Sequence, residues 1–406
     1  MKLQRALLLA RAAYAALRKV GQTNFAIALP IGWLGLCLAL CTLAFPVIGD
    51  AQSITVFDAP GAGIAAGEGT FAVAINPAGL LAGSFTDANN VFHGFLRYRD
   101  GRIVRFDAPG AGTGPGAPGC AFTLSCPGSI TQSINSRNDI TGYYIDANNV
   151  SHGFVRYCDG RIATFDYSGA GTGGGQGTIS ENINSEGEIA GEYIDSNGAG
   201  HGFLRLTDGT MVSFDAQDAG TGSNQGTWVS SVDGLTPTGE ISGFYTDSSG
   251  VNHGYLRAAD GAITEFDALG AGTGSGQGTY SGGINAAETI LGFFFDSNGV
   301  YHGYLRTLDG RITEFDVSGA GTSGGEGTLP ASINLSGAIP GSYIDANGVS
   351  RGFLRAPDGT ITKFEIRGAG TGASQGTFPY CNNPAGTIIG WDIDKNNVYH
   401  GFLRTP

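Results

Sequence analysis

Short segments rich in aromatic and β-branched residues recur along the chain from residue 54 onward, and glycine, aspartate or asparagine separates one segment from the next. Within the first full unit the pattern predicts four strands, at residues 70–76, 79–87, 93–97 and 103–107. Apolar residues fall on both faces of the last two strands, so we expect each unit to be covered on both sides. Many short strands joined by glycine-rich turns indicate an all-β fold.

The third and fourth strands of six units are joined by an Asp-Gly pair, the first at Asp100-Gly101. Asp-Gly is typical of a two-residue hairpin turn, because both turn positions need a positive φ. Such a turn would place Phe95 opposite Phe106, and Leu96 on the other face with Ile103.

The unit repeats along the chain. A His-Gly-aromatic-aliphatic-Arg motif opens each third strand, and Arg351 replaces the histidine in one of the seven copies. The histidines of the motif are His93, His152, His201, His253, His302 and His400. Most copies are 49 residues apart. This period, with four strands in each unit, predicts a seven-bladed β-propeller of four-stranded blades.

The two ends of the chain are expected to meet in the last blade. The final unit stops at Pro406 without a fourth strand, whereas residues 54–58 match the fourth strand at residues 103–107. We therefore expect the N-terminal strand to complete the last blade. An open array would instead need polar capping units, and the sequence shows none.

Residues 1–51 differ from the predicted propeller at residues 52–406. Basic residues precede an uncharged apolar run at residues 25–48, and the small residues Gly49 and Ala51 follow it. This order is typical of a signal peptide cleaved after Ala51. The alternative is a retained signal anchor, since a helix of that length can span a bilayer. Either interpretation makes the rest of the chain secreted, extracellular or periplasmic.

The exported part is acidic. The whole chain has a net charge of −13, and its leader holds five of the 22 basic residues but one of the 35 acidic residues. An acidic surface opposes binding to nucleic acid, which needs a basic footprint. Membrane contact is expected only if the N-terminal segment is retained as an anchor.

The repeat resembles the bacterial extracellular repeat family named after its His-Ala-Phe (HAF) motif, over roughly residues 54–406. Here the motif reads His-Gly-Phe, as at residues 93–95, or His-Gly-Tyr, as at residues 253–255. Glycine in place of alanine is a departure from the family pattern. The resemblance implies export and a propeller, and it implies no reaction.

All six histidines occupy the same repeat position, which favours a structural role over catalysis. His93 follows Asp87 across a short turn, so we expect an Asp–His contact within each blade, and Arg351 would keep it as an ion pair with Asp345. The turn itself often reads Asp-x-Asn-Gly, as at residues 195–198. No cofactor is expected. Calcium at these turns is the alternative, although the late bidentate glutamate of a calcium loop is missing.

A polar residue precedes the Gly-Thr pair that starts the first strand in six units. These residues are Glu68, Gln176, Gln225, Gln277, Glu326 and Gln375. By topology they would ring one mouth of the central channel. Two interpretations stay open: each side chain bonds the backbone of its own glycine-rich loop, or the ring binds a cation or a neutral sugar.

Cysteines in an exported chain can form disulfides. Cys120 and Cys126 lie together in the longest insertion, and we predict that they form a disulfide. Cys158 and Cys381 fall on non-adjacent blades and are predicted to be free.

No catalytic arrangement stands out in the sequence, so no catalytic residue is predicted. Near-identical repeats favour a non-catalytic scaffold or binding module whose partner is a glycan or a protein. The alternatives are a polysaccharide-acting propeller enzyme, either a hydrolase or a lyase, and a purely structural surface protein. Trp228 and Trp391 break the repeat pattern, and a tryptophan can stack on a sugar.

Overall fold

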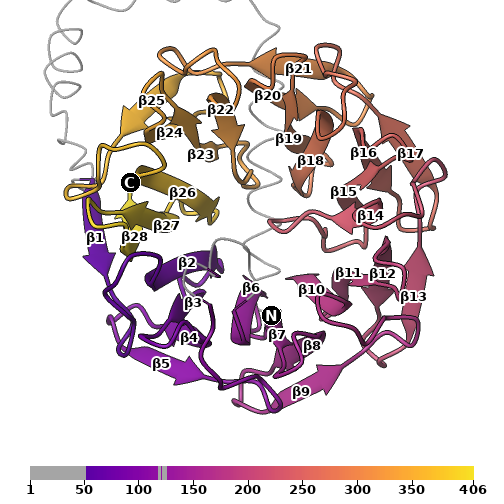
Figure 1. Ribbon diagram of the computed structural model, residues 1–406. Helices are drawn as coiled ribbons and strands as arrows, with labels where there is room; N and C mark the ends of the chain where they lie inside the picture. Colours follow the sequence, from indigo (N-terminus) through magenta and orange to yellow (C-terminus); the bar gives the residue numbers. More distant parts are fainter. Residues whose placement is uncertain (1–51, 118–119, 121–125) are drawn as a thin grey trace, which may run out of the picture. The chain divides into compact units, whose positions relative to one another are not determined.

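The computed structural model describes residues 52–117, residue 120 and residues 126–406. The predicted signal peptide or anchor at residues 1–51 lies outside the described residues. The described part is made of strands and turns that form a ring of repeats (Figure 1). In this part of the chain, no helix is long and apolar enough to cross a bilayer.

Each repeat contributes four strands, and their order runs from the centre of the ring outward (Figure 1). The first strands are β2 (Gly69–Ile75), β6 (Gly128–Ile134), β10 (Gly177–Ile183), β14 (Gly226–Val229), β18 (Gly278–Ile284), β22 (Gly327–Pro330) and β26 (Gly376–Asn382). The second strands are β3 (Leu81–Thr86), β7 (Ile140–Ile145), β11 (Ile189–Ile194), β15 (Ile241–Thr246), β19 (Ile290–Phe295), β23 (Ile339–Ile344) and β27 (Ile388–Ile393). The third strands are β4 (Phe92–Arg97), β8 (Ser151–Arg156), β12 (Gly200–Arg205), β16 (Asn252–Arg257), β20 (Tyr301–Arg306), β24 (Ser350–Arg355) and β28 (Tyr399–Thr405). The outer strands are β5 (Ile103–Phe106), β9 (Ile162–Phe165), β13 (Met211–Phe214), β17 (Ile263–Phe266), β21 (Ile312–Phe315), β25 (Ile361–Phe364) and β1 (Ser53–Phe57).

Hydrogen bonds join these strands into one continuous sheet. Strands pair antiparallel within a repeat, whereas each first strand also pairs parallel with the preceding third strand, as Gly177 does with Ser151. All 28 strands of the described residues therefore belong to one closed sheet of mixed pairing. This finding corrects the predicted fold class, a seven-bladed β-propeller of four-stranded blades: the sheet is shared by all repeats, and no group of four strands is a sheet of its own.

A glycine at the start of each first strand makes the parallel link. Gly177 has a φ of +118°, and a Cβ at this position would lie 2.0 Å from the carbonyl oxygen of Ser151. Only glycine combines a positive φ with so close an approach of two backbones. The sequence pattern shows this glycine but not its role, because its partner belongs to another repeat.

The N-terminal strand pairs with the C-terminal strand, as the repeat count predicts. β1 lies antiparallel to β28, with Val56 opposite Phe402. Gly69 of β2 then pairs with Tyr399 of β28. The ring is therefore closed by contacts between the two ends of the described chain.

Packing explains the glycine and the arginine of the repeated motif. A Cβ on Gly94 would lie 2.5 Å from the ring of Phe106, so glycine leaves room for that ring. The Arg97 guanidinium lies 4.8 Å from the ring centre of Phe57, which belongs to the neighbouring repeat. The same contact recurs at the other junctions at 4.7 to 5.2 Å. Each junction thus gains a cation–π interaction.

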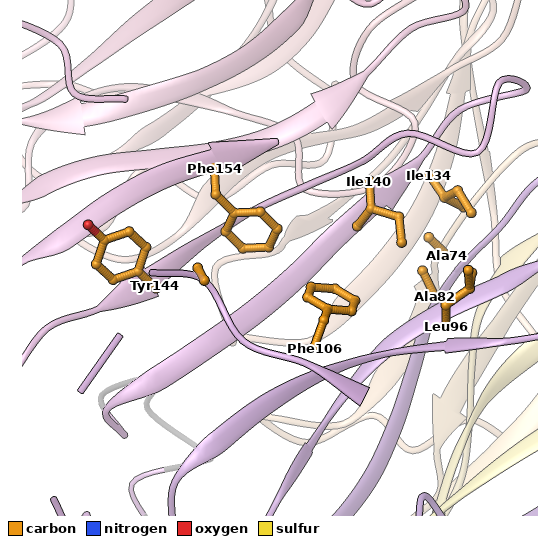
Figure 2. Packing of buried hydrophobic residues seen from close by; sticks show 9 residues of the cluster. Ala74, Ala82, Leu96, Phe106, Ile134, Ile140, Tyr144 and Phe154 are labelled. Carbon is orange, nitrogen blue, oxygen red and sulfur yellow. The ribbon is translucent and has the colours of Figure 1, made fainter. Parts of the chain in front are cut away.

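The apolar core also crosses the junctions. Figure 2 shows Phe106 of the first repeat beside Phe154 and Ile140 of the second. The rings of Phe106 and Phe154 meet edge to face, with centres 6.1 Å apart. Burial of these side chains stabilises the contact between two repeats as well as each repeat itself.

The hairpin between the third and fourth strands differs from the predicted two-residue turn. Arg97 pairs with Ile103, and Gly94 rather than Phe95 lies opposite Phe106. Gly101 has a φ of +89°, whereas Asp100 does not have a positive φ. A turn followed by a left-handed glycine bulge explains the shift, because it adds one residue to the loop. Phe95 is consequently free to enter the core, where it is fully buried.

Asparagines between the first and second strands link the repeats near the centre of the ring. Each side-chain amide donates to a backbone carbonyl of the next repeat, at 3.1 to 3.4 Å. The donors are Asn76, Asn135, Asn184, Asn285, Asn334 and Asn383. In the fourth repeat Thr236 takes this place, and its hydroxyl contacts Glu240 of the same turn instead.

Candidate binding site in the central cavity

The repeats differ from one another at paired positions on their first and second strands, near the centre of the ring. The third residue of each first strand lies directly opposite the residue that follows the glycine of the second strand, as Phe378 does opposite Trp391. The seven pairs are Phe71–Ser84, Ile130–Tyr143, Ile179–Glu192, Trp228–Phe244, Tyr280–Phe293, Leu329–Ser342 and Phe378–Trp391. The outer motif is nearly constant, so the constant positions form a framework and the variable ones form an irregular inner wall.

This inner wall encloses two adjoining cavities, of about 660 Å³ and about 480 Å³. We call them together the central cavity. Both are lined by Glu181, Ser231, Phe378, Tyr380 and Trp391, so they meet at these five residues. A volume of this size suits a small ligand or a few units of a polymer.

Aromatic rings crowd one side of the central cavity. Trp391 lies 5.0 Å from Tyr380, 5.9 Å from Phe71 and 6.2 Å from Phe378 between ring centres. The ring of Phe71 also packs on Tyr399, at 4.4 Å. Rings held by one another in this way offer a rigid apolar surface at low cost in entropy.

Two buried carboxyl groups also line the central cavity. Glu181 is 6% exposed and Glu192 is 7% exposed. The backbone N–H of Val229 donates to Glu192, and Gln132 contacts the Glu181 carboxyl. Oε2 of Glu181 has no hydrogen-bond partner among the described residues. A buried polar atom without a partner is costly, so a donor that reaches this oxygen supplies a hydrogen bond that the described residues do not.

Burial is the main cause of the raised pKa values of Glu181 and Glu192. It raises the pKa of Glu181 to about 8. Burial and then the nearby Glu181 carboxyl raise the pKa of Glu192 well above its usual range. Among the described residues that line the central cavity there is no lysine, arginine or histidine. The cavity therefore holds acidic groups without an internal counter-charge.

An insertion in the fourth repeat adds further polar groups. The chain between Ser230 and Thr236 leaves the regular strand, and Asp233 there has a φ of +50°. Burial raises the pKa of Asp233 to about 7. Ser231 of the same segment lines both parts of the central cavity.

The predicted rim residues lie in the loops before the first strands, where each accepts a hydrogen bond from its own loop backbone. Gln277, for example, accepts from the Gly274 N–H at 2.9 Å and donates to the Ser297 carbonyl at 3.1 Å. The matching acceptors are Glu68, Gln176, Gln225, Glu326 and Gln375. None of the six residues lines either part of the central cavity. These contacts favour the loop-stabilising interpretation, and binding at the rim stays a prediction.

Each predicted structural histidine lies between two aspartates. Nδ1 of His93 is 2.7 Å from Asp107 at the end of the fourth strand, and Nε2 is 3.5 Å from Asp87. The other five histidines repeat the arrangement, at 2.9 to 3.0 Å and 3.7 to 3.9 Å. The contact with the turn aspartate was predicted, whereas the closer contact with the fourth strand was missed. The sequence does contain a signal for this closer contact, because the histidine and the aspartate are 14 positions apart in repeat after repeat, as His93 and Asp107 are.

Arg351 keeps this link with a different side chain. Its Nε donates to Asp345 at 2.7 Å, which confirms the predicted ion pair, and Nη1 contacts Glu365. Elsewhere the turn aspartates bond their own backbone, as Asp146 does with the N–H groups of Asn148 and Val150. Among the described residues no group of three or more histidine, cysteine or acidic side chains could hold a metal ion. Calcium at the turns stays an alternative prediction.

The predicted disulfide joins Cys120 to Cys126, and Cys158 and Cys381 are free thiols. Both bonded cysteines are buried in an apolar cluster with Phe92 and Ile130. The insertion is therefore anchored to the ring through its disulfide.

Trp228 and Trp391 stand out in the sequence, whereas Glu181, Glu192 and Tyr380 were not predicted as site residues. At the repeat positions of these three residues, the residue type changes from repeat to repeat. A comparison of the aligned repeats would therefore identify them by their variation. Their burial and proximity could not be read from that variation.

The fold has relatives among solved structures. A lectin, BP39L from Burkholderia pseudomallei, matches with a TM-score of 0.52 and 11% identity, over 81% of this chain and 94% of the lectin chain. This match supports a propeller-type repeat fold. A puromycin hydrolase matches with a TM-score of 0.46 and 11% identity, over 84% of this chain and half of that chain. AofleA from Arthrobotrys oligospora matches with a TM-score of 0.42 and 11% identity, over 78% of this chain and 90% of its own. No family model and no curated protein sequence matches the chain.

Proposed function

We propose that the chain is an exported, non-catalytic binding module that holds a glycan in the central cavity. The observation that carries this proposal is the contrast between a constant framework and a variable inner wall. A structural role alone gives no reason for side chains that face a cavity to differ from repeat to repeat while the motif around them is nearly constant.

The lining suits a sugar better than a purely apolar ligand. Trp391 and Phe71 offer flat surfaces for the apolar faces of sugar rings. Gln132, Ser231 and Glu181 supply a few polar groups for hydroxyls. The lectin with a similar fold is a sugar-binding protein by its name, which adds support at the level of fold alone.

Export is part of the proposal. It is supported by the basic and apolar pattern of residues 1–51 and by a disulfide, which forms in oxidising compartments.

A polysaccharide hydrolase is the second candidate, because Glu181 and Glu192 place two carboxyl groups in one cavity. Glycosidases use such a pair, one group as acid and the other as base or nucleophile. Binding remains the first proposal because both groups have a raised pKa, whereas a hydrolase needs one of them ionised.

A glycan array followed by calorimetry tests the proposal. Trp391→Ala should lower the affinity for the tightest-binding glycan by about tenfold or more, the equivalent of one lost aromatic stacking contact. Leu269→Ala, on an exposed surface away from the cavity, should leave affinity unchanged. An array with no glycan bound, or equal affinity of Trp391→Ala and the unaltered protein, would refute the proposal. New reducing ends that disappear in Glu181→Gln would favour the hydrolase instead.

A further inference from the structure

Glu181 and Glu192 are buried carboxyl groups of the central cavity, and no basic side chain of the described residues lies beside them there. Oε2 of Glu181 faces no donor among the described residues, although its side chain lines both parts of the central cavity. Proteins neutralise buried acids with a cation, a proton or a bound ligand. A proton fills this role on Glu181, and since no basic side chain of the described residues lines the cavity, a cation that replaces the proton comes from outside.

The surroundings of Glu181 also favour a cation. Tyr143, Tyr380 and Glu192 lie close enough to influence it electrostatically. Trp391 and Phe378 line the same two cavities. Aromatic faces beside a carboxylate attract ammonium groups through the ring quadrupole, and the attraction grows when water is excluded.

We propose that the central cavity binds the ammonium group of an amino-sugar unit, with Glu181 as the carboxylate that contacts it. This inference rests on the proposed function, since it specifies which sugar the cavity selects. The sugar ring stacks on the Trp391 side, and the ammonium group donates to the free oxygen of Glu181. The constant residues of the repeated motif take no part in this contact.

Binding is then coupled to proton release. Glu181 must lose its proton to pair with an ammonium group, and the proton goes to solvent. The groups that face it are Glu192, Tyr143 and Tyr380, with the neutral Gln132 amide. None of these is a base that would keep the proton, so affinity for a fixed cation should rise with pH until about 8, where Glu181 ionises.

Two oligosaccharides of equal length separate amine recognition from sugar recognition. One is a β-1,4-linked glucosamine oligomer, and the other is its N-acetylated form, which lacks the charge. At pH 7 we expect the amine form to bind the protein at least about tenfold more tightly, as for a charge-assisted hydrogen bond. Glu181→Gln should remove this preference. Glu186→Gln removes an exposed carboxylate of the same repeat and should keep the preference.

Equal affinity for the two oligomers, or an unchanged preference in Glu181→Gln, would overturn the inference and leave the proposed function intact. Selective binding of some other neutral glycan would also overturn the inference alone. If no glycan binds, the proposed function fails. Tetramethylammonium chloride, whose charge does not titrate, then tests the cation site by itself: affinity that rises between pH 6 and 8 supports the site, and affinity independent of pH overturns it.

Discussion

Nδ1 of His400 lies 2.9 Å from Oδ1 of Asp58, although 342 positions separate the two residues in the sequence. In the other repeats with a histidine the same contact spans 14 positions, as between His253 and Asp267. The link that is local elsewhere is therefore made between the two ends of the described chain at the last repeat. It holds β1 in the position that an outer strand takes in every other repeat.

Removal of residues 52–60 should lower the melting temperature markedly. The deletion removes the pairing of β1 with β28 and the Phe57 ring under Arg97. Asp58→Asn keeps the strand and weakens only the contact with His400, which is partly exposed, so it should cost less than about 1 kcal/mol. Thermal unfolding followed by circular dichroism compares the two variants. A deletion that melts like Asp58→Asn would show that β1 does not close the ring.

Gly94→Ala should destabilise the protein by about 1–3 kcal/mol, because the new methyl group would overlap the Phe106 ring. Gly114→Ala is the matched control, since a Cβ at Gly114 meets nothing within 4 Å. Urea unfolding gives the difference in free energy. Equal midpoints would mean that Phe106 moves aside at no cost.

The free energy of unfolding should fall as pH rises through the neutral range. Burial raises the pKa of Glu181 from 4.5 to about 8, so the folded state holds a proton that the unfolded chain releases. The stability that depends on this proton is fully present below about pH 4.5 and is lost as pH approaches 8.

Glu181→Gln cannot ionise, and its unfolding free energy should therefore fall less between pH 5 and pH 8.5. Glu186→Gln should behave like the unaltered protein, because Glu186 is exposed. Urea titrations at the two pH values measure the slopes. Parallel slopes for Glu181→Gln and the unaltered protein would contradict a buried, protonated Glu181.

Gln277→Ala should cost about 1 kcal/mol of stability, because Gly274 and Ser297 each lose a hydrogen-bond partner. Affinity for a glycan in the central cavity should not change, since Gln277 does not line it. A variant with unaltered stability and reduced affinity would restore the predicted binding rim.

The sequence predicted the parts of the fold that repeat locally. The strands and the Asp87–His93 contact follow from spacing within one unit, and the pairing of the N-terminal strand follows from the count of the units. Contacts between units were not predictable in the same way. The approach of Gly177 to Ser151 joins the repeats into one sheet, and no pattern within a single unit reveals it.

The candidate site was predicted less well for a related reason. The nearly constant glutamines and glutamates before the first strands hold their own loops, whereas the cavity is formed by residues that differ from repeat to repeat. Glu181 aligns with Val73 of the first repeat and Gln132 of the second, and only the three-dimensional arrangement shows that these positions face one space.

The interruption of the asparagine ring at Thr236 has a consequence for motion. Every other junction near the centre has such an amide that reaches the next repeat, while the junction between the fourth and fifth repeats lacks one. There the Ser230 and Ser242 hydroxyls donate to backbone carbonyls of the fifth repeat, and the Ile284 N–H donates to the Asp233 carbonyl. The Ile284 amide should therefore exchange slowly with deuterium, because the insertion of the fourth repeat braces this junction in place of the missing side-chain amide.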